Sequence, residues 1–194
     1  MGKGQIVRFR AGFEEYWELL KEAEYKADYS ENEIVAMSYE SNIHSRIVTE
    51  ILFTLRKIFD SDTHTVHDPN RPIFVKYFQA IHNPDASIII EPSELFEYQP
   101  GMNAETTPLI VVEVLSKTTR DYDYSEKLPH YKQIPSLRQI IYVESAKPFI
   151  TVYEREQDGR QWINTDYSRM DEQFIVYGQP VALEEIYRKV KWPV

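Results

Sequence analysis

The stretch Leu109-Ile-Val-Val-Glu-Val-Leu115 is the most strand-like run of the chain. A run that is apolar on both faces is typical of a central strand that is covered above and below. Because side chains alternate along a strand, we expect Glu113 on the same face as Leu109 and Val111. A carboxylate on such a face costs several kcal/mol unless it is paired, protonated or bound to a metal ion. Glu113 is therefore the most informative residue of the sequence.

Two helices are expected on the N-terminal side of this strand. The segment from Phe13 to Lys26 has apolar residues at helical spacing with glutamates between them. A wide apolar face also marks 42–59, and Ser41 precedes that segment as an N-cap. The sequence further predicts, in chain order, strands over 74–79 and 86–90, a loop over 93–107, a helix over 122–133 that Pro129 bends or shifts, strands over 139–143 and 149–154, a hairpin turn over 157–160 and a closing helix over 183–190.

The order of these elements indicates one layered domain. The 194 residues suit a single domain, and neither a linker nor an internal repeat divides them. Helices are expected first, followed by a mostly mixed sheet that one helix crosses, which is an α/β or α+β arrangement. Residues 1 to about 30 are expected to form an N-terminal helical extension.

Composition excludes several classes of protein. Cysteine is absent, which excludes disulfides, Cys-ligated zinc, iron–sulfur clusters and a thiol nucleophile. The formal net charge is −9, which argues against a simple basic nucleic-acid coat, although a local basic groove is compatible with it. No apolar run approaches the roughly 20 residues of a membrane span, and the start lacks the apolar centre of a signal peptide. We therefore expect a cytoplasmic protein that does not enter a membrane.

Asp85 is the second acid that bears on function. By itself, Asp85 after Pro84 is a turn residue, and Glu113 by itself is a glutamate neutralised by a nearby Arg or Lys. Two adjacent strands could instead aim both carboxylates at one point. Hard oxygen ligands there suit Mg²⁺, which binds through one or two carboxylates together with waters and phosphate oxygens.

The segment that follows the Glu113 strand carries further candidate residues. Lys127 lies on the expected helix, and Tyr131 follows it by one turn. Without context, Lys127 is a solvated lysine and Asp123 is a helix cap or first-turn acid. His44, near the start of the second helix, is either a packed histidine bonded to a carbonyl or a residue that lines the site.

Together these residues resemble a known family. The resemblance rests on Pro84-Asp85, on the run 108–116, on Asp123, Lys127 and Tyr131, on 134–138 and on the closing segment 183–190. With these motifs the chain resembles the bacterial Uma-two type restriction endonucleases of the PD-(D/E)xK nuclease superfamily. The likeness extends from about residue 30 to the end of the chain.

The resemblance implies a restriction-endonuclease-like core, in which a mixed β-sheet is flanked by helices. It implies that Asp85 and Glu113 hold Mg²⁺, or Mn²⁺ in its place. The superfamily usually has a lysine two residues after the glutamate, where this chain has Leu115. The resemblance implies that Lys127 takes over that role.

The same resemblance gives Asp123, Tyr131 and His44 supporting roles. The chain departs from the family pattern at Lys117, where a proline is common, and at Tyr124-Ser125, where Arg-Gly is common. Neither departure removes a carboxylate.

The functional hypothesis is a metal-dependent endonuclease that hydrolyses phosphodiester bonds in nucleic acid, with DNA as the expected partner. The alternative is a catalytically inactive module of the nuclease fold that binds nucleic acid or a protein. The segment 117–138 holds five basic and three acidic residues, which is a modest basic footprint. A homodimer would suit the cutting of two strands, and the sequence carries no coiled-coil pattern that demonstrates one.

Overall fold

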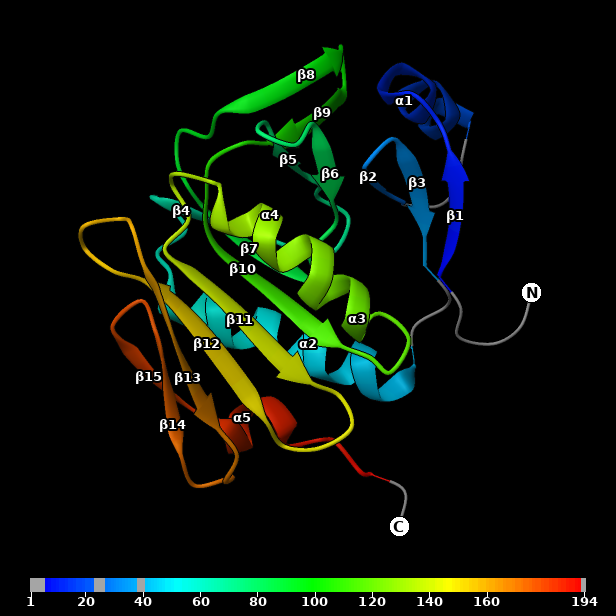
Figure 1. Cartoon of the computed structure of the whole chain (residues 1–194). Coiled ribbons are helices and arrows are strands. Elements are labelled where there is room, and N and C mark those ends of the chain that lie inside the picture. The colour runs from blue at the N-terminus through cyan, green and yellow to red at the C-terminus, as the bar shows by residue number, and fades with distance from the viewer. Residues whose placement is uncertain (1–5, 23–26, 38–40, 193–194) are drawn as a thin grey trace.

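Residues 6–22, 27–37 and 41–192 are described by the computed structural model, which places two β-sheets and a β-hairpin among short helices (Figure 1). In chain order the helices are α1 (Phe13–Glu22), α2 (Asn42–Ile58), α3 (Arg120–Tyr122), the π-helical turn η1 (Asp123–Lys127), α4 (Leu128–Lys132) and α5 (Leu183–Tyr187). No helix in these described ranges is long and apolar enough to cross a membrane.

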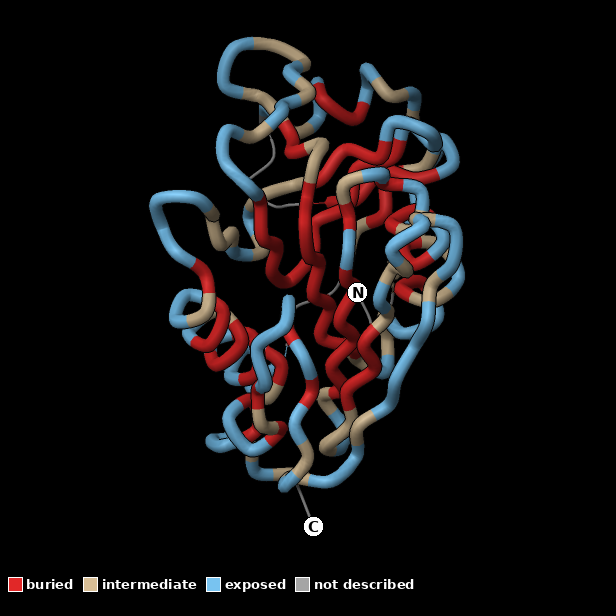
Figure 2. Tube along the Cα trace, turned by 90° about the vertical axis from the view of Figure 1, so that its left-hand side faces the viewer, coloured by how far each residue is buried: buried red, intermediate tan, exposed pale blue. Residues whose placement is uncertain are grey.

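A six-stranded mixed sheet forms the centre of the molecule. Its strands, in spatial order, are β13 (Trp162–Tyr167), β12 (Ile150–Arg155), β11 (Gln139–Glu144), β10 (Pro108–Leu115), β7 (Ala86–Ile90) and β4 (His64–His67). β10 runs parallel to β11 and antiparallel to β7. Every residue of β10 is buried, and Figure 2 shows the buried trace gathered in the central strands. The prediction of a central strand covered on both faces is thus confirmed.

A second, seven-stranded sheet packs beside the first. Its strands, in spatial order, are β1 (Val7–Arg10), β3 (Glu33–Ala36), β2 (Asp28–Ser30), β6 (Ala80–His82), β5 (Ile73–Val75), β9 (Met102–Glu105) and β8 (Leu95–Gln99). α1 packs its aromatic side chains, Phe13 and Trp17, on this sheet. The remaining strands form the hairpin β14 (Gln173–Val176) and β15 (Gln179–Ala182).

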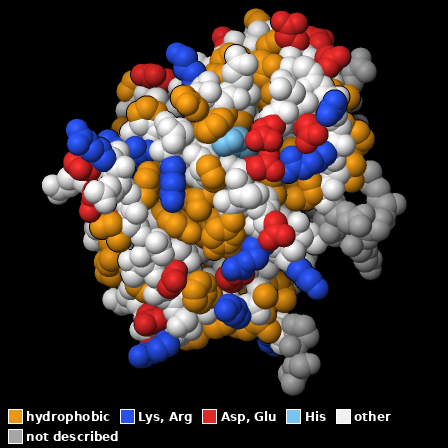
Figure 3. Space-filling view, viewed as in Figure 1, with side chains coloured by type: hydrophobic (Ala, Val, Ile, Leu, Met, Phe, Trp, Pro, Cys, Tyr) orange, Lys and Arg blue, Asp and Glu red, His pale blue; other side chains and the backbone are white. Residues whose placement is uncertain are grey.

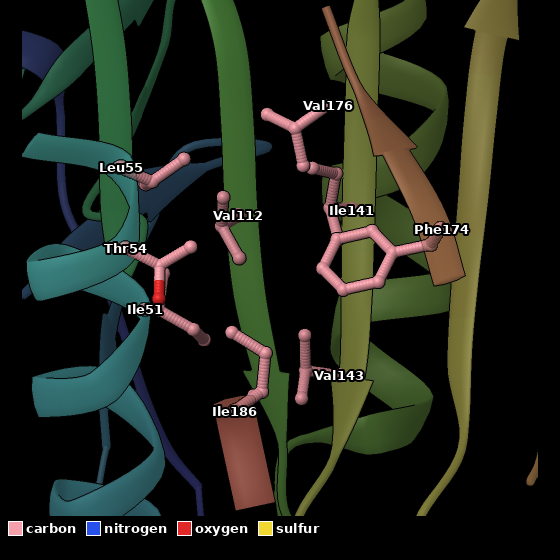
Figure 4. A pocket seen from close by; sticks show the side chains of 9 residues that line it. All are labelled: Ile51, Thr54, Leu55, Val112, Ile141, Val143, Phe174, Val176 and Ile186. Carbon is pink, nitrogen blue, oxygen red and sulfur yellow. The ribbon is translucent and has the colours of Figure 1, made fainter. Parts of the chain in front are cut away.

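Two cores lie on opposite faces of the six-stranded sheet. α2, α5 and the hairpin β14–β15 cover one face, while η1 and α4 cover the other (Figure 1). Between α2 and the sheet is a cavity of about 10 Å³ whose lining is apolar apart from Thr54 (Figure 4). Side chains of α2 such as Ile51 and Leu55 face Val112 of β10 there, so this space belongs to the core and is not a binding site.

Several predicted elements form as expected. α2 begins at Asn42, and the Ser41 side chain accepts a hydrogen bond from the backbone N–H of His44 at 3.2 Å, which confirms the N-cap. β7 has the predicted bounds 86–90. β11, β12 and α5 lie where the sequence placed two strands and the closing helix, and the predicted turn over 157–160 connects β12 to β13. α1 begins at Phe13 as expected, and the end predicted for it, at Lys26, falls outside the described residues.

Two predictions about strands are wrong. The strand over 74–79 ends at Val75, because the chain turns through Gln79, whose φ of 49° is left-handed, and returns as β6. The loop over 93–107 is instead the hairpin β8–β9, which turns at Gly101 with a φ of 83°. β8 is an edge strand with an exposed face, so it lacks the apolar run that identifies a buried strand.

Two further expectations need correction. Helices do not come first, since β1 precedes α1; β1 belongs to the seven-stranded sheet, and α1 packs on that sheet. Leu109 packs with the α2 core, whereas Val111 packs with the α4 core. The register between β10 and β7 shifts between Pro108 and Ile110, and this irregularity turns Leu109 away from the face that strict alternation predicts.

Replacing Ser41 by alanine is expected to lower the free energy of unfolding by about 1 kcal/mol, because one N–H at the start of α2 loses its acceptor. Urea unfolding of the two proteins measures the difference. Ser45→Ala, at an exposed position of the same helix, serves as the control and should stay within about 0.5 kcal/mol of wild type. Equal stabilities for Ser41→Ala and wild type would contradict the capping role.

Candidate active site

Glu113 and Asp85 lie on adjacent strands at the same level of the six-stranded sheet. Val112 of β10 pairs with Ala86 of β7, and Asp85 directly precedes Ala86. Continuing that antiparallel register places Asp85 opposite Glu113, where residues facing each other have Cβ atoms roughly 5 Å apart. Glu113 belongs to the face that α4 covers, since its neighbours Val111 and Leu115 pack there. The sheet pairing therefore brings the two predicted acids together.

Asp85 is fixed by the backbone of the neighbouring strand. Its Oδ2 accepts a hydrogen bond from the N–H of Val114 at 2.7 Å. His44 Nε2, from the first turn of α2, lies 3.2 Å from the same oxygen. Both side chains are buried, at 7% and 6% exposure. His44 therefore contacts the site through Asp85, and the reading of Asp85 as a plain turn residue does not describe it.

Glu113 receives two donors from the helical segment above the sheet. Lys127 Nζ donates to Glu113 Oε1 at 3.0 Å, and the hydroxyl of Tyr131 donates to the same oxygen at 2.7 Å. Lys127 is only 2% exposed, so it is not the solvated lysine that a helix surface would give. The structure thus places Lys127 and Tyr131 directly against Glu113.

The turn that carries Lys127 is widened to π-helical geometry. Leu128 N–H bonds to the carbonyl of Asp123, five residues back. Pro129 follows at the start of α4 and has no N–H with which to continue an α-helical ladder. Such single π turns are frequent at functional sites. The helical segment begins at Arg120, so Pro129 does not shift its start, and the irregularity is instead the π-helical turn that carries Asp123 and Lys127.

Lys127 contacts three carboxylates in all. Besides Glu113, its Nζ lies 3.4 Å from Asp123 Oδ1 and 3.5 Å from Asp28 Oδ2. Asp123 does not act as a helix cap here, because it lies within η1 and is buried against the lysine. Asp28 comes from β2 of the other sheet, so both sheets contribute to one cluster of charges.

Asp28 and its partners were not found from the sequence. No local sequence motif marks Asp28. The side chains that bond to its carboxylate are those of His82, Asn83 and Tyr122, which come from other parts of the chain. The only local signal was the run His82-Asn83 immediately before Pro84-Asp85, where two polar residues follow the buried Ala80-Ile81. The sequence leaves this pair unassigned because only strand pairing brings Asp28 to it.

Electrostatics of this cluster are dominated by negative charge. Burial raises the pKa of Glu113 to about 8, with Asp123 and Asp85 adding to the rise and Lys127 opposing it. Burial also raises the pKa of Asp123. Burial opposes the charge on Lys127, but Glu113, Asp28 and Asp123 together raise its pKa well above the ordinary value. The lysine is therefore charged at neutral pH, and Glu113 binds a proton more readily than an ordinary carboxyl group in the metal-free protein.

The donor set fits a hard divalent cation at two residues. The contacts above engage Oδ2 of Asp85 and Oε1 of Glu113, so a cation would bind through the other oxygen of each group. Two carboxylates suffice for Mg²⁺, which completes its shell with waters and phosphate oxygens. The raised pKa of Glu113 fits as well, because a cation would offset the repulsion from Asp85 and Asp123. Within the described ranges no group of three or more His, Asp or Glu side chains is placed to hold a metal.

The surface around the site carries charges of both signs. Of the five cations between 117 and 138, Lys127 is buried and Arg120 is paired with Glu144. Figure 3 shows Lys and Arg interspersed with Asp and Glu over this face. The modest basic footprint expected from the sequence is thus reduced further. A surface hollow of about 570 Å³ lies elsewhere, against β12, β13 and Ile175, and contains none of the site residues.

Comparisons with known proteins cover nearly the whole chain. A family model described as "Uma2: Putative restriction endonuclease" matches residues 13–184. The uncharacterized protein slr1290 of Synechocystis sp. is 27% identical over 176 residues, which cover 90% of each chain. The uncharacterized protein sll1609 of the same organism is 22% identical over 152 residues, which cover 78% of this chain and 84% of the relative.

A solved structure has the same fold. It is described as a "putative nuclease belonging to DUF820" from Anabaena variabilis, and it aligns with a TM-score of 0.71 at 15% identity. The alignment covers 91% of this chain and 97% of that one. The predicted fold class, a mixed sheet flanked by helices in a nuclease fold, is thereby confirmed.

Glu113→Gln is expected to change how the stability of the metal-free protein depends on pH. The folded state holds a proton on Glu113 up to about pH 8, whereas the unfolded chain releases it near the ordinary carboxyl pKa. Because the folded state binds more protons in this interval, the group lowers the free energy of unfolding as pH rises, by up to about 1.4 kcal/mol per pH unit. Urea unfolding in EDTA across the interval measures the slope, which the variant should lack.

Glu105→Gln is the matched control. Glu105 is as deeply buried, but contacts with His67 and Arg71 outweigh its burial and keep its pKa below the ordinary value. Its removal should leave the falling slope of the wild type in place. A slope that persists in Glu113→Gln would show that another group holds the proton.

Proposed function

The chain belongs to the Uma2 family of restriction endonucleases, and from this premise we propose that it is a Mg²⁺-dependent endonuclease that hydrolyses phosphodiester bonds in DNA. The membership also confirms the family that the sequence motifs indicated. One observation carries the proposal: Asp85 directly precedes β7 and stands opposite Glu113 of β10 when the strand register is continued by one residue, and the ammonium of Lys127 lies 3.0 Å from Glu113. Two acids and a lysine at one point supply the charges that phosphodiester hydrolysis needs.

Asp85 and Glu113 would hold the metal ion. When bound, Mg²⁺ or Mn²⁺ supplies a Lewis acid for the scissile phosphate and lowers the pKa of an attacking water. Asp85 is held ready for this role by the N–H of Val114, which fixes one of its oxygens. His44 contacts that same oxygen and restricts the rotation of the carboxylate further.

Lys127 offsets negative charge that builds on the phosphate in the transition state. The superfamily lysine two residues after the glutamate is replaced by Leu115, which is packed in the core. Lys127 instead reaches the carboxylate of Glu113 from the helical turn η1. Tyr131 holds Glu113 in place through its hydroxyl, and Asp123 holds the lysine from one turn away.

Substrate would approach from the side of Asp85 and His44, which retain slightly more exposure than Glu113 and Lys127. The chain carries a net charge of −9, so its overall charge repels DNA at long range. Binding is therefore expected to need the metal ion, which brings positive charge to the phosphate.

Cleavage of plasmid DNA in the presence of Mg²⁺ or Mn²⁺ tests the proposal. We expect Glu113→Ala and Asp85→Ala to reduce cleavage to background, because each removes a metal ligand. Lys127→Met should reduce kcat by about 10²- to 10³-fold, the cost of losing one group that stabilises transition-state charge. Glu105→Ala, which removes a buried acid outside the site, serves as the control and should cleave like wild type once corrected for folded protein.

Calorimetric titration with Mg²⁺ separates the enzyme from the inactive module of the same fold. The enzyme predicts metal binding that is lost in Asp85→Ala. Absence of binding by the wild type would favour the module, and equal cleavage by wild type and Glu113→Ala would assign the activity to a contaminant.

A further inference from the structure

We infer that Asp28, together with Asp123, positions Lys127 for the reaction, and that the seven-stranded sheet thereby helps to hold the lysine that η1 carries over the six-stranded sheet. This inference rests on the proposed function. It assigns a role to a residue outside the family motifs quoted above, in a strand that contributes nothing else to the site.

The contacts of Asp28 identify it as an anchor. The side chain is fully buried, and its Oδ2 lies 3.5 Å from Lys127 Nζ. Lys127 Nζ is thus held between carboxylates of both sheets, with Glu113 on β10 and Asp28 on β2. Asp28 thus adds a third carboxylate contact to those of Glu113 and Asp123, and it restricts an ammonium that is carried on a flexible four-carbon stem.

Asp28 has no oxygen left for a metal ion. Its Oδ1 accepts from both the backbone N–H and the side-chain amide of Asn83, at 2.8 and 2.9 Å. Its Oδ2 accepts from Tyr122 at 3.1 Å, lies 3.3 Å from His82 Nδ1, and faces Lys127. A carboxylate offers about four lone-pair sites, so these donors saturate it. Asp28 acts on the reaction through Lys127 and not as a ligand.

The partners of Asp28 are themselves fixed. His82 Nε2 lies 2.9 Å from Nδ1 of His130, whose ring stacks on Phe78 at a centroid distance of 4.0 Å. The amide of Asn83 also donates to the carbonyl of Ala27 at 3.0 Å. His82 and Asn83 directly precede Pro84-Asp85. One short segment therefore orients the anchor of the lysine and carries the metal-binding acid.

Asp28→Asn tests this role, because it keeps the shape of the side chain and removes the charge that faces Lys127. We expect kcat for DNA cleavage to fall by about a hundred-fold, the cost of misplacing a catalytic group by about 1 Å. KM and the Mg²⁺ affinity measured by calorimetry should stay unchanged. In a Lys127→Met background, Asp28→Asn should have no further effect on kcat.

Glu105→Gln is the matched control, since Glu105 is also a buried, ion-paired acid of the seven-stranded sheet but contacts Arg71 instead of Lys127. It should leave kcat unchanged. Tyr122→Phe is the second variant, because it removes one donor to Asp28 without changing any charge. It should lower kcat by a smaller factor, again only while Lys127 is present.

A readout without catalysis makes the result independent of the proposed function. In ¹⁵N-lysine NMR spectra, the ammonium of Lys127 should give a slowly exchanging signal in wild type and Glu105→Gln, and this signal should disappear in Asp28→Asn. Weaker Mg²⁺ binding, additive losses in the Lys127→Met background or an unchanged ammonium signal would each overturn the positioning role. Where the wild type does not cleave DNA, the proposed function fails and the ammonium signal alone decides the inference.

Discussion

The arrangement of the site depends on an excess of buried negative charge around one lysine. Four carboxylates, those of Asp28, Asp85, Glu113 and Asp123, are buried within one cluster, and Lys127 is the ammonium among them. Such charges are tolerated inside a protein only when donors or cations surround them. Asp28, Asp85 and Glu113 all accept hydrogen bonds, but burial and the neighbouring acids still raise the pKa of Glu113 to about 8 in the metal-free protein. The four carboxylates outnumber the single ammonium group, and this excess of acidic groups is the physical reason to expect a divalent cation.

Much of the fold follows from local patterns in the sequence. The bounds of β7, the cap at Ser41 and the burial of β10 are set by alternation, capping chemistry and apolar runs, which a short window of sequence contains. The sequence did not predict the hairpin β8–β9, because an edge strand with an exposed face resembles a loop in composition. The face on which Leu109 packs was wrongly predicted, because it depends on a register shift between two strands that the sequence of one strand does not reveal.

The site was predictable where its residues lie in family motifs, and not where only tertiary structure joins them. Asp85, Glu113 and Lys127 stand in recognisable contexts, and the sheet and helix bring them into contact range. Asp28 is 99 residues away from Lys127 in sequence, and pairing of β2 with β6 is what carries it to His82 and Asn83. Leu115 stands where the superfamily usually has its lysine, while Lys127 contacts Glu113 from η1, so contact with the carboxylate depends on the geometry of the site and not on one sequence position.

A crystal structure of the wild type grown with Mn²⁺ would test the central claim most directly, because the anomalous signal of manganese locates the ion without reference to activity. The account predicts a manganese peak in contact with the carboxylates of Asp85 and Glu113, at the roughly 2.1 Å of a hard-ion oxygen contact, with Lys127 still directed at Glu113. A peak at other residues, or no peak at saturating Mn²⁺ while Glu113 remains bonded only to Lys127 and Tyr131, would contradict it.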